Sequence, residues 1–505
     1  MNNDKFLKNS ILLTLSNSTT GILKFVFSII LSRELGAEGM GLYALIMPIY
    51  DLFCCLVCGG MVTALSKQAS SFYTKHDCKN LHKCIHVTII FDLIWTIFIA
   101  VFVSLNSNYI GLKIIKDSRS IHSLILICIA LIFVALSSII KGYFYGISNV
   151  TTPSIIDIFE KFIRILVTIL VIKLLPVKEI EYTVTAVYAA LAAGEFVSFL
   201  LLYIFYRHSK TKDFSNHCKD YPMEASPQLL FDILFMAVPL CVNGFLTTAI
   251  STVSTLILPR RLLLAGFSHT TSLGMIGKFS GMALTIIFFP LVVITSMSIV
   301  LIPDIAETVE RKDYMVLEER LKQVIKISFL IGISTLIICF SISTPLGKLL
   351  FARDDLGTYI KFAAISAPFT YVSSTTFSIL NGLGKQGVLL RNSLIVAIEE
   401  LVLLYVLTSI PSINILGYGL SLLITSITSL IMNMHEIKKK CYMEFSLGNI
   451  IIDILLSLLI YFIINIMNNI IPNTLFKLKI STIIILGFIL FFSINFILDK
   501  TIKSN

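Results

Sequence analysis

Residues 121–146 read IHSLILICIALIFVALSSIIKGYFYG, with a single charged residue, Lys141, close to the end. A helix needs about 20 consecutive apolar residues to cross the hydrocarbon core of a bilayer. This stretch is long enough, and it is interrupted by no charge before its last turns. It therefore predicts a membrane-spanning helix, and the rest of the chain repeats the same pattern.

Apolar runs of similar length recur along the whole chain. We expect about fourteen spanning helices, with short loops and no sizeable soluble domain. The fold class predicted is therefore an all-α membrane protein. The predicted segments are residues 10–32, 41–64, 84–105, 121–146, 154–175, 182–206, 229–258, 274–302, 325–345, 359–382, 388–408, 413–436, 446–468 and 479–498.

The composition excludes a water-soluble protein. Of the 505 residues, 56% are hydrophobic and 14% charged, and the mean hydropathy is +0.89. Soluble domains carry about 25% charged residues. The net charge of +10 is expected from cytoplasmic loops, which retain Lys and Arg, rather than from a nucleic-acid partner. The ten cysteines and eight histidines lack the paired spacing of a zinc site, so we expect no metal and no cofactor.

The distribution of basic residues predicts the orientation. If the N-terminus is cytoplasmic, the inside segments hold 23 of the forty Lys and Arg residues and the outside segments hold 12. This bias favours a multi-pass protein of the cell membrane with both termini in the cytoplasm. Lys5 and Lys8 precede a hydrophobic stretch too long for a signal peptide, so the first segment is expected to remain as a span.

Two pairs of similar motifs indicate an internal duplication. Residues 30–35 (ILSREL) end the first predicted helix and residues 257–262 (ILPRRL) end the seventh, while residues 142–146 (GYFYG) and 381–385 (NGLGK) precede the fifth and eleventh. Duplicated halves are common in transporters, with the substrate path between them; chance similarity of apolar segments is the alternative. We expect two pseudo-symmetric six-helix lobes at 1–210 and 229–440, a linker at 211–228, and two further helices in 441–505.

Three motifs in order also carry a family resemblance. Residues 32–43 (SRELGAEGMGLY), residues 142–146 before Pro153, and residues 258–262 (LPRRL) resemble the polysaccharide transporter branch of the multidrug/oligosaccharidyl-lipid/polysaccharide exporter (MOP) superfamily, in particular its sporulation and lipid II flippase members. The resemblance covers about residues 5–440. It implies a flippase, not an enzyme, that translocates a polyprenyl-pyrophosphate-linked saccharide by alternating access, for peptidoglycan, polysaccharide or spore-cortex synthesis.

The resemblance has one departure. The lipid II flippases carry arginines and an aspartate along and just after the first helix, facing a central cavity. At the aligned positions this chain has Gly21, Phe27 and Leu42, and Lys24 is the only charge inside the first helix.

Charged residues inside spanning segments are the candidate substrate-binding residues. A Lys, Arg or Asp at a helix centre costs about 2.5–3.5 kcal/mol on insertion scales, so such residues face the bundle interior and have a partner or a function. Lys24 is expected to meet the pyrophosphate as a mobile point charge, and Arg164 to bind it in a bidentate manner. Asp92 is a further candidate for lining the cavity. The residues predicted to bind the substrate, apart from this further candidate, are Lys24, Asp51, Glu160, Arg164, Glu195 and Lys278.

These charges also have structural interpretations. Lys24 could instead form an ion pair with Asp51 or Glu195, or extend its side chain toward the membrane interface (snorkelling). The charges of the fifth helix could pair among themselves, since Glu160 and Arg164 are i,i+4 neighbours, as are Asp157 and Lys161. Arg33, Arg260 and Arg261 are expected at the outer ends of their helices, where they either guide the headgroup or anchor the interface.

Glu399 and Glu400, in the middle of the eleventh helix, are candidates for coupling to Na+ or H+; pairing with Lys278 or Arg391 is the alternative. If these carboxylates dominate the cavity, the protein is an ion-coupled multidrug or metabolite antiporter of the same superfamily. A membrane enzyme would need a larger external loop, and a transport-dead scaffold is a further alternative. The sequence has no Gly-x-x-x-x-Gly-Lys-Ser/Thr loop. The partners expected are the lipid-linked saccharide, membrane lipids and cell-wall synthesis proteins.

Overall fold

The computed structural model describes residues 3–174, 179–215, 221–441, 447–472 and 476–504. These residues are almost entirely helical, and no β-strand occurs among them. The predicted all-α membrane fold is confirmed. Part of the predicted linker, residues 216–220, lies outside the described residues.

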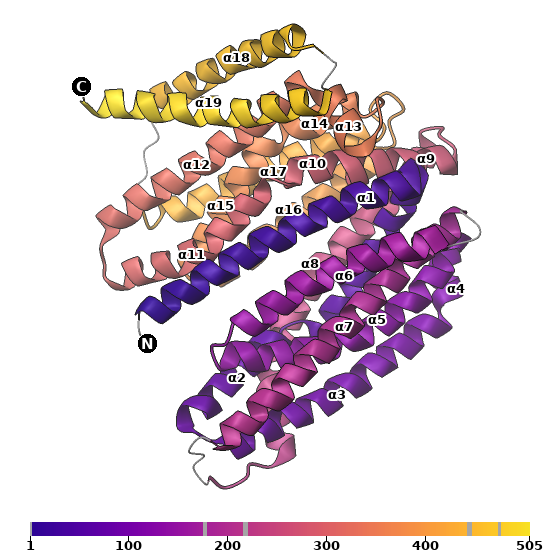
Figure 1. Ribbon diagram of the computed structural model, residues 1–505, viewed down its shortest axis with the longest axis vertical. Helices are drawn as coiled ribbons and strands as arrows, with labels where there is room; N and C mark the ends of the chain where they lie inside the picture. The colour runs from indigo at the N-terminus through magenta and orange to yellow at the C-terminus, as the bar shows by residue number, and fades with distance from the viewer. Residues whose placement is uncertain (1–2, 175–178, 216–220, 442–446, 473–475, 505) are drawn as a thin grey trace. The chain divides into compact units, whose positions relative to one another are not determined.

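In the described residues of the first half there are eight α-helices and two short helices of other types. Gly36, at φ 66° and ψ −170°, kinks α1 between the predicted helices 10–32 and 41–64. This backbone conformation favours glycine because a side chain with a Cβ atom is strained there. The elements are α1 (Asn3–Cys58), α2 (Met61–Lys75), α3 (Cys78–Leu105), α4 (Ser107–Tyr109), η1 (Ile110–Ile115), η2 (Ser118–Ser120), α5 (Ile121–Gly146), α6 (Thr151–Leu174), α7 (Ile180–Ser215) and α8 (Ser226–Leu264) (Figure 1).

The second half continues with α9 (His269–Ile276), η3 (Gly277–Ala283), α10 (Leu284–Phe288), α11 (Leu291–Glu310), α12 (Tyr314–Ser341), α13 (Ser343–Phe351), α14 (Gly357–Ile365), α15 (Ala367–Gly382), α16 (Gln386–Leu407), α17 (Leu416–Lys438), α18 (Leu447–Ile470) and α19 (Phe476–Ser504). The stretch η3 is a π-helix, a form that is rare and often found at functional sites.

Every predicted span overlaps a helix, but the count of fourteen stays a prediction. The described residues contain 11 helices long and apolar enough to cross a membrane, which makes this a multi-pass membrane protein. The predicted spans 10–32 and 41–64 fall within one continuous candidate, and 274–302 is divided at Pro290 into two. Helix α15 has 16 residues, and α6 and α16 carry too many charges to qualify by hydropathy. Two helices with candidate charges, α6 and α16, are thus not identified by composition alone.

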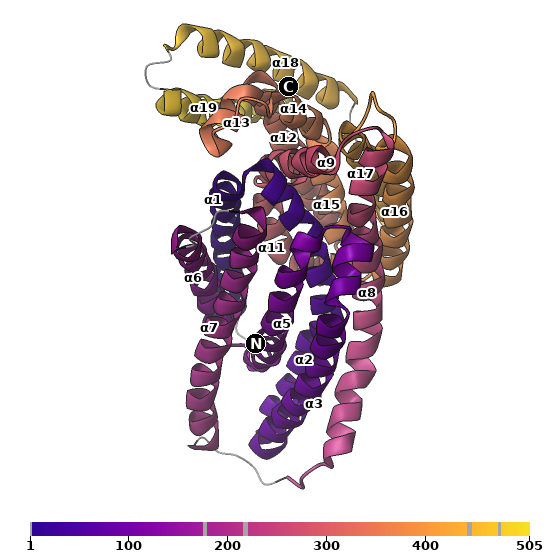
Figure 2. The same cartoon turned by 90° about the vertical axis from the view of Figure 1, so that its right-hand side faces the viewer.

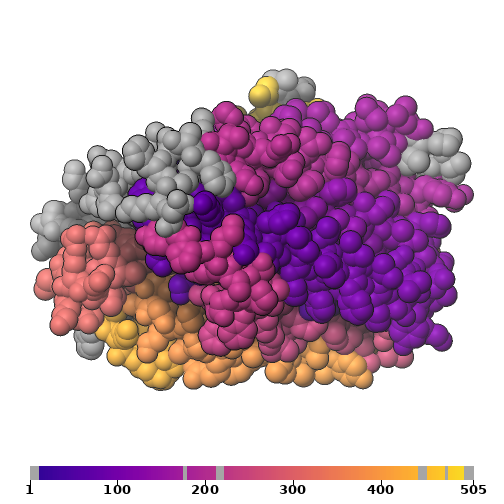
Figure 3. Space-filling view, turned by 90° about the horizontal axis from the view of Figure 1, so that it is seen from below, coloured from indigo at the N-terminus to yellow at the C-terminus, as the bar shows by residue number. Residues whose placement is uncertain are grey.

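The chain divides into two compact units. The first comprises residues 1–27 and 34–257, and the second comprises residues 28–33 and 258–505. In the first unit α5 packs against α2, α3 and α7, and α6 packs on α7 (Figures 1 and 2). Seen from below, α2 and α3 form a closely packed purple surface (Figure 3). The predicted lobe boundary at 211–228 stays a prediction.

The second unit repeats this packing scheme. There α15 packs against α11, α12 and α17, and α16 packs on α17. Helices α3 and α12 both have 28 residues and are both capped by an aspartate, Asp77 and Asp313, that accepts a backbone N–H bond. Three loop residues of the first unit with a left-handed backbone each have a left-handed counterpart in the second unit: His76 with Lys312, Lys116 with Ala352, and Ser148 with Gly384. The difference in residue number is the same for all three pairs, and this difference is the constant separation between the units. The units can therefore be compared position by position.

A matched pair of glycines allows equivalent helices to approach closely. A Cβ atom on Gly146 of α5 would lie 2.8 Å from the carbonyl oxygen of Ser66 in α2. A Cβ atom on Gly382 of α15 would lie 3.0 Å from the carbonyl oxygen of Ile302 in α11. These four residues keep the same constant separation. The duplication thus extends to a close contact between equivalent helices of each unit.

Candidate functional site

Six charged side chains form one cluster in the first unit: Lys141 of α5, Asp157, Glu160, Lys161 and Arg164 of α6, and Glu195 of α7. Arg164 joins the two glutamates, since its Nη2 atom lies 2.6 Å from Glu160 Oε1 and 3.0 Å from Glu195 Oε1. The i,i+4 spacing places Glu160 and Arg164 on one face of α6, as predicted. Gly194 makes room for them on α7, because a Cβ there would lie 3.0 Å from Glu160 Oε1.

The remaining members of the cluster balance its charge. Lys161 pairs with Glu160, and Lys141 Nζ lies 2.6 Å from Asp157 Oδ1. The i,i+4 spacing predicts a pair between Asp157 and Lys161 instead, so Lys141 is the partner that sequence reasoning missed. Its isolation in an otherwise uncharged stretch was the available signal. Three basic and three acidic side chains make the cluster neutral as a whole.

Arg164 has one N–H group that forms no hydrogen bond to any described residue. Its side chain is 12% exposed, and its Nε atom is buried without a hydrogen-bond partner among the described residues. A buried donor left unsatisfied is unfavourable, by about 1–3 kcal/mol. A guanidinium with a free N–H is suited to bind an additional oxyanion by a charge-assisted hydrogen bond.

Lys24 and Asp51 of α1 are neighbours in the same unit. Both side chains are exposed, and they interact electrostatically. Neither belongs to an ion pair within 4.0 Å in the described part of the chain. Tyr43 interacts with both Arg164 and Asp51, which links this pair to the charge cluster. Within the described residues, the ion pair proposed as an alternative for Lys24 is therefore not formed, and the Lys24 ammonium group is not tied to one carboxylate.

Lys278 of η3 is paired in the second unit. Its Nζ lies 2.7 Å from Asp355 Oδ2 and 5.9 Å from the centroid of the Tyr359 ring. Asp355 also accepts two hydrogen bonds from Arg353, each 2.8 Å long. These Arg353 bonds, with Lys278 in support, hold the pKa of Asp355 well below its usual range. Lys278 is therefore part of a loop-anchoring network rather than an unpaired cation.

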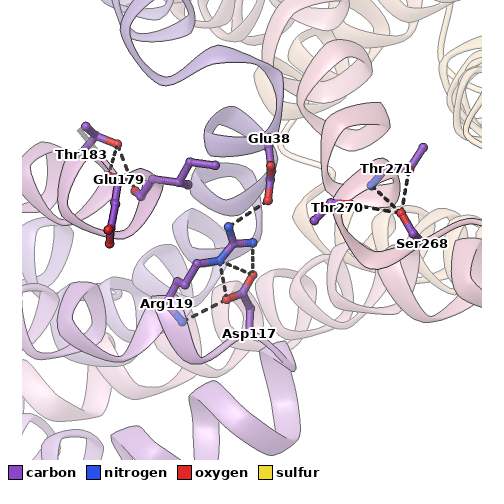
Figure 4. A network of polar contacts seen from close by, with 9 residues as sticks. Glu38, Asp117, Arg119, Glu179, Thr183, Ser268, Thr270 and Thr271 are labelled. Atoms are coloured by element: carbon purple, nitrogen blue, oxygen red, sulfur yellow. Dashed lines mark hydrogen bonds and ion pairs between the residues drawn. The ribbon is translucent and has the colours of Figure 1, made fainter. Parts of the chain in front are cut away.

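The first unit has the same network with its charges exchanged. Arg119 Nη1 lies 2.8 Å from Glu38 Oε1, and Arg119 Nη2 lies 2.8 Å from Asp117 Oδ2 (Figure 4). By the constant separation between the units, Asp117 and Arg119 correspond to Arg353 and Asp355. Each unit thus links the equivalent loop to a helix by three charged side chains. In the first unit one arginine pairs with two carboxylates, and in the second unit one carboxylate pairs with two basic residues. No motif in the sequence pointed to this triad.

We predict that Arg119→Gln lowers the free energy of unfolding by about 1–3 kcal/mol, because it removes charge-assisted bonds to the buried Asp117. Thermal unfolding in detergent measures this. The matched control is Arg353→Gln, whose partner Asp355 is more exposed, at 44% against 4% for Asp117; its effect should be smaller. Equal effects of the two variants would contradict the role assigned to burial.

The two glutamates of α16 are not paired with any basic residue that the structure describes. Glu399 Oε1 accepts a hydrogen bond of 2.9 Å from Thr428 of α17, while Glu399 Oε2 is buried without a partner among the described residues. Glu400 interacts electrostatically with Tyr418 and occupies the position equivalent to Arg164. The alternative partners are engaged elsewhere, Lys278 with Asp355 and Arg391 with Glu436.

Two of the three arginines predicted as gates bind helix ends. Arg33 donates from Nε and Nη2, at 2.8 Å each, to the carbonyl oxygens of Leu350 and Leu349 at the end of α13, where cations are favoured by the helix dipole. Arg261 donates to the carbonyl oxygen of Tyr405 and stacks 3.6 Å from the centroid of its ring. Their position suits anchoring, and a role in guiding a headgroup stays a prediction, as it does for the exposed Arg260.

The described residues contain no group of three or more His, Cys, Asp or Glu side chains that could hold a metal ion. What the clusters offer instead is charge: cationic donors beside carboxylates, within helices that are otherwise apolar. Such an arrangement can bind and release an anion or a small cation.

Comparison with known proteins gives consistent results. The family described as Polysaccharide biosynthesis protein matches residues 6–309. Stage V sporulation protein B of Bacillus subtilis (strain 168) is 26% identical over 422 residues, which cover 83% of this chain and 80% of that protein. Lipid II flippase MurJ of the same strain is 22% identical over 459 residues, which cover 86% and 83%.

Solved structures show the same fold. Lipid II flippase MurJ in an inward closed conformation is similar with a TM-score of 0.70 at 16% identity, covering 97% of this chain and 98% of that one. A multidrug resistance MATE family transporter of the MOP superfamily, in an inward-facing conformation, is similar with a TM-score of 0.65 at 14% identity, covering 85% and 98%. The fold is therefore that of MOP superfamily transporters.

Proposed function

From the premise that this chain belongs to the polysaccharide biosynthesis protein family, we propose that it is a flippase for a polyprenyl-pyrophosphate-linked saccharide. It moves this precursor of peptidoglycan or another polysaccharide across the cell membrane by alternating access, in cell-wall or spore-cortex synthesis. The substrate class follows the relatives that are named for sporulation and for lipid II flipping. The protein acts as a transporter and catalyses no covalent step.

The observation that carries the proposal is the state of Arg164. Its guanidinium is held between Glu160 and Glu195 and still has a buried Nε–H group without a partner among the described residues. A pyrophosphate oxygen satisfies that donor, and a second oxygen takes the place of Glu195, the more distant of the two carboxylates. Bidentate binding of this kind is the geometry that Arg provides and Lys does not.

Lys24 supplies the first electrostatic attraction. It is exposed, and it interacts electrostatically with its neighbour Asp51 without forming an ion pair within 4.0 Å. An ammonium group on a flexible stem can follow a headgroup as it moves. The neutral cluster around Arg164 then receives the anion by exchanging one carboxylate partner for another.

The termini are proposed to lie in the cytoplasm, as the distribution of Lys and Arg predicts. Energy is proposed to come from an Na+ or H+ gradient, the membrane potential or removal of the product. Cell-wall synthesis proteins are proposed as partners, and membrane lipids surround the helices.

One observation favours a second candidate function. Glu399 carries a buried oxygen without a partner among the described residues, and the fold is shared with multidrug transporters. A protein that uses this carboxylate to exchange a cation for Na+ or H+ would be an ion-coupled multidrug or metabolite antiporter.

Reconstitution into liposomes tests the leading proposal. Labelled polyprenyl-pyrophosphate saccharides are placed in one leaflet, and their appearance in the other is scored with an impermeant reagent. Faster movement with the protein than in empty liposomes supports a flippase. Absence of any movement, together with export of small organic cations, would replace it with the antiporter.

We predict that Glu399→Gln reduces the stimulation of transport by an Na+ or H+ gradient at least about fivefold, within the range of coupling energies between linked sites. The rate without a gradient should change less. The control is Glu307→Gln, an exposed glutamate paired with Arg311, which should leave the stimulation intact. Unchanged stimulation in Glu399→Gln would remove this residue from ion coupling.

A further inference from the structure

Asp92 of α3 carries a buried carboxylate that lacks a hydrogen-bond partner among the described residues. It is 1% exposed, and neither of its carboxylate oxygens has a hydrogen-bond partner in the part of the chain that the structure describes. An ionised carboxylate taken out of water needs a cation or several donors, and without them it takes up a proton. Neither the charge cluster around Arg164 nor the proposed transport route uses this residue.

Three hydroxyl groups on α3 and α5 donate to backbone carbonyl oxygens and not to the Asp92 carboxylate. Thr88 and Thr96 lie one helical turn before and after it, and they donate to the carbonyl oxygens of Cys84 and of Asp92 itself, at 2.8 and 2.6 Å. Ser138 of α5 donates to the carbonyl oxygen of Ala135 at 2.7 Å. These three hydroxyl groups therefore donate nothing to the carboxylate, whose oxygens have no hydrogen-bond partner among the described residues.

The second unit shows what this position looks like when it is satisfied. By the constant separation between the units, Asp92 corresponds to Ser328 of α12, which is also fully buried. The Ser328 hydroxyl lies 2.5 Å from the hydroxyl of Thr375 in α15. The residue of α5 equivalent to Thr375 is Ile139, which is fully buried and has no polar side-chain atom. The first unit thus has a carboxylate in place of the serine and lacks the threonine that would bond to it.

The charged groups on neighbouring elements are engaged elsewhere or exposed. The Cys58 thiol of α1 interacts with Asp92 and also with Lys141 and Glu195, but Lys141 pairs with Asp157 and Glu195 with Arg164. At the start of α3, His82 bonds Tyr206 of α7, and Tyr143 of α5 bonds Ser209. Lys67 and Lys75 of α2 and Tyr109 of α4 are exposed, and Tyr145 of α5 interacts with Lys141 and Asp157.

We propose that Asp92 is a proton-binding site of the transport cycle. Asp92 holds a proton while α3 and α5 are packed together, and it releases the proton when water enters between the two helices. Binding of the proton follows from the environment of Asp92 alone. Its link to transport rests on the proposed function.

A proton fits this site better than a metal ion. Metal cations that bind oxygen take several oxygen ligands in proteins, whereas the site offers one carboxylate beside the apolar Ile139. No metal-binding group of His, Cys, Asp and Glu occurs within the described ranges. A proton needs only one acceptor.

Infrared spectroscopy of the reconstituted protein without substrate tests proton binding. At neutral pH, the carbonyl stretch of a protonated carboxyl group should be present and should disappear in Asp92→Asn. The control Asp304→Asn removes an exposed carboxylate that pairs with Arg320, and it should leave the band intact. The proposal would be overturned if Asp92→Asn removed no such band from the wild-type spectrum. It would also be overturned if added Na+ abolished the band in the wild type.

The second unit supplies a design for the complementary variant. Ile139→Thr introduces the hydroxyl found at Thr375, and the Asp92 band should shift to lower frequency as its carbonyl gains a hydrogen bond. If Asp92→Asn does not fold, the double variant Asp92→Ser, Ile139→Thr reproduces the Ser328–Thr375 pair and should fold without the band. A band that persists in this double variant would also overturn the proposal.

Transport measurements then test the link to the cycle. If one proton must leave Asp92 in each cycle, the rate changes by up to about tenfold per pH unit, and Asp92→Asn should lose this dependence. A variant that keeps the wild-type pH profile contradicts the link, even if the band is present. If the wild type moves no labelled lipid but shows the band, the proposed function fails and the proton site stands.

Discussion

Replacing Arg164 with methionine is expected to abolish flipping and to destabilise the protein by about 3–5 kcal/mol, the usual result of breaking a buried charge pair. Arg164 lies 2.6 Å from Glu160 and 3.0 Å from Glu195. Without it the two carboxylates repel each other at the interface of α6 and α7, with Lys161 as the remaining cation beside Glu160.

A charge-compensated variant separates the structural effect from the functional one. In the double variant Arg164→Met, Glu195→Gln the surplus carboxylate is gone, so most of the stability should return. Transport should remain absent if Arg164 binds the pyrophosphate. Arg164→Lys should fold well and transport slowly, because lysine cannot bind in a bidentate manner. Recovery of full transport in the double variant would show that Arg164 serves the fold alone.

The sequence predicts the helices better than it predicts their breaks. Residues 121–146 form a helix with the predicted bounds, because a long apolar run has few alternatives in a membrane. The kink at Gly36 joins two predicted helices, and the division at Pro290 separates one predicted helix into two. Such breaks depend on single backbone conformations that hydropathy does not report.

The duplication is visible in the sequence only at a few motifs. The structure extends it to the capping residues Asp77 and Asp313. It also extends it to left-handed residues such as His76 and Lys312, which differ in residue type and share only geometry. A backbone conformation can be kept while the side chain changes. This explains why a search for similar residues finds the end of the first predicted helix but not the turn between α2 and α3 at His76 and Asp77.

The candidate site is predictable where its residues share a helix. The pair of Glu160 and Arg164 follows from i,i+4 spacing. The contacts of Arg164 with Glu195 and of Lys141 with Asp157 join different helices, and no periodicity in one segment encodes which helix lies beside it. The lack of a donor at Asp92 is of the same kind, because it depends on Ile139 in a neighbouring helix.

The second large effect is expected at Lys24. Lys24→Ala should lower the flipping rate roughly tenfold to 100-fold, since a hydrogen bond to a charged group contributes about 1.5–3 kcal/mol and each 1.36 kcal/mol is a factor of about ten in rate. Stability should change by less than about 0.5 kcal/mol, because the side chain is exposed and holds no ion pair within 4.0 Å in the described part of the chain.

Two comparisons make this prediction sharp. Lys67 is also an exposed lysine of the first unit but lies outside the candidate site, so Lys67→Ala should transport at the wild-type rate. Lys24→Arg keeps the charge and should retain most of the activity. If the protein flips a lipid with an anionic headgroup, Lys24→Ala must reduce the flipping rate more than Glu399→Gln does. The reverse order would mean that a carboxylate, and therefore a cationic substrate, dominates recognition.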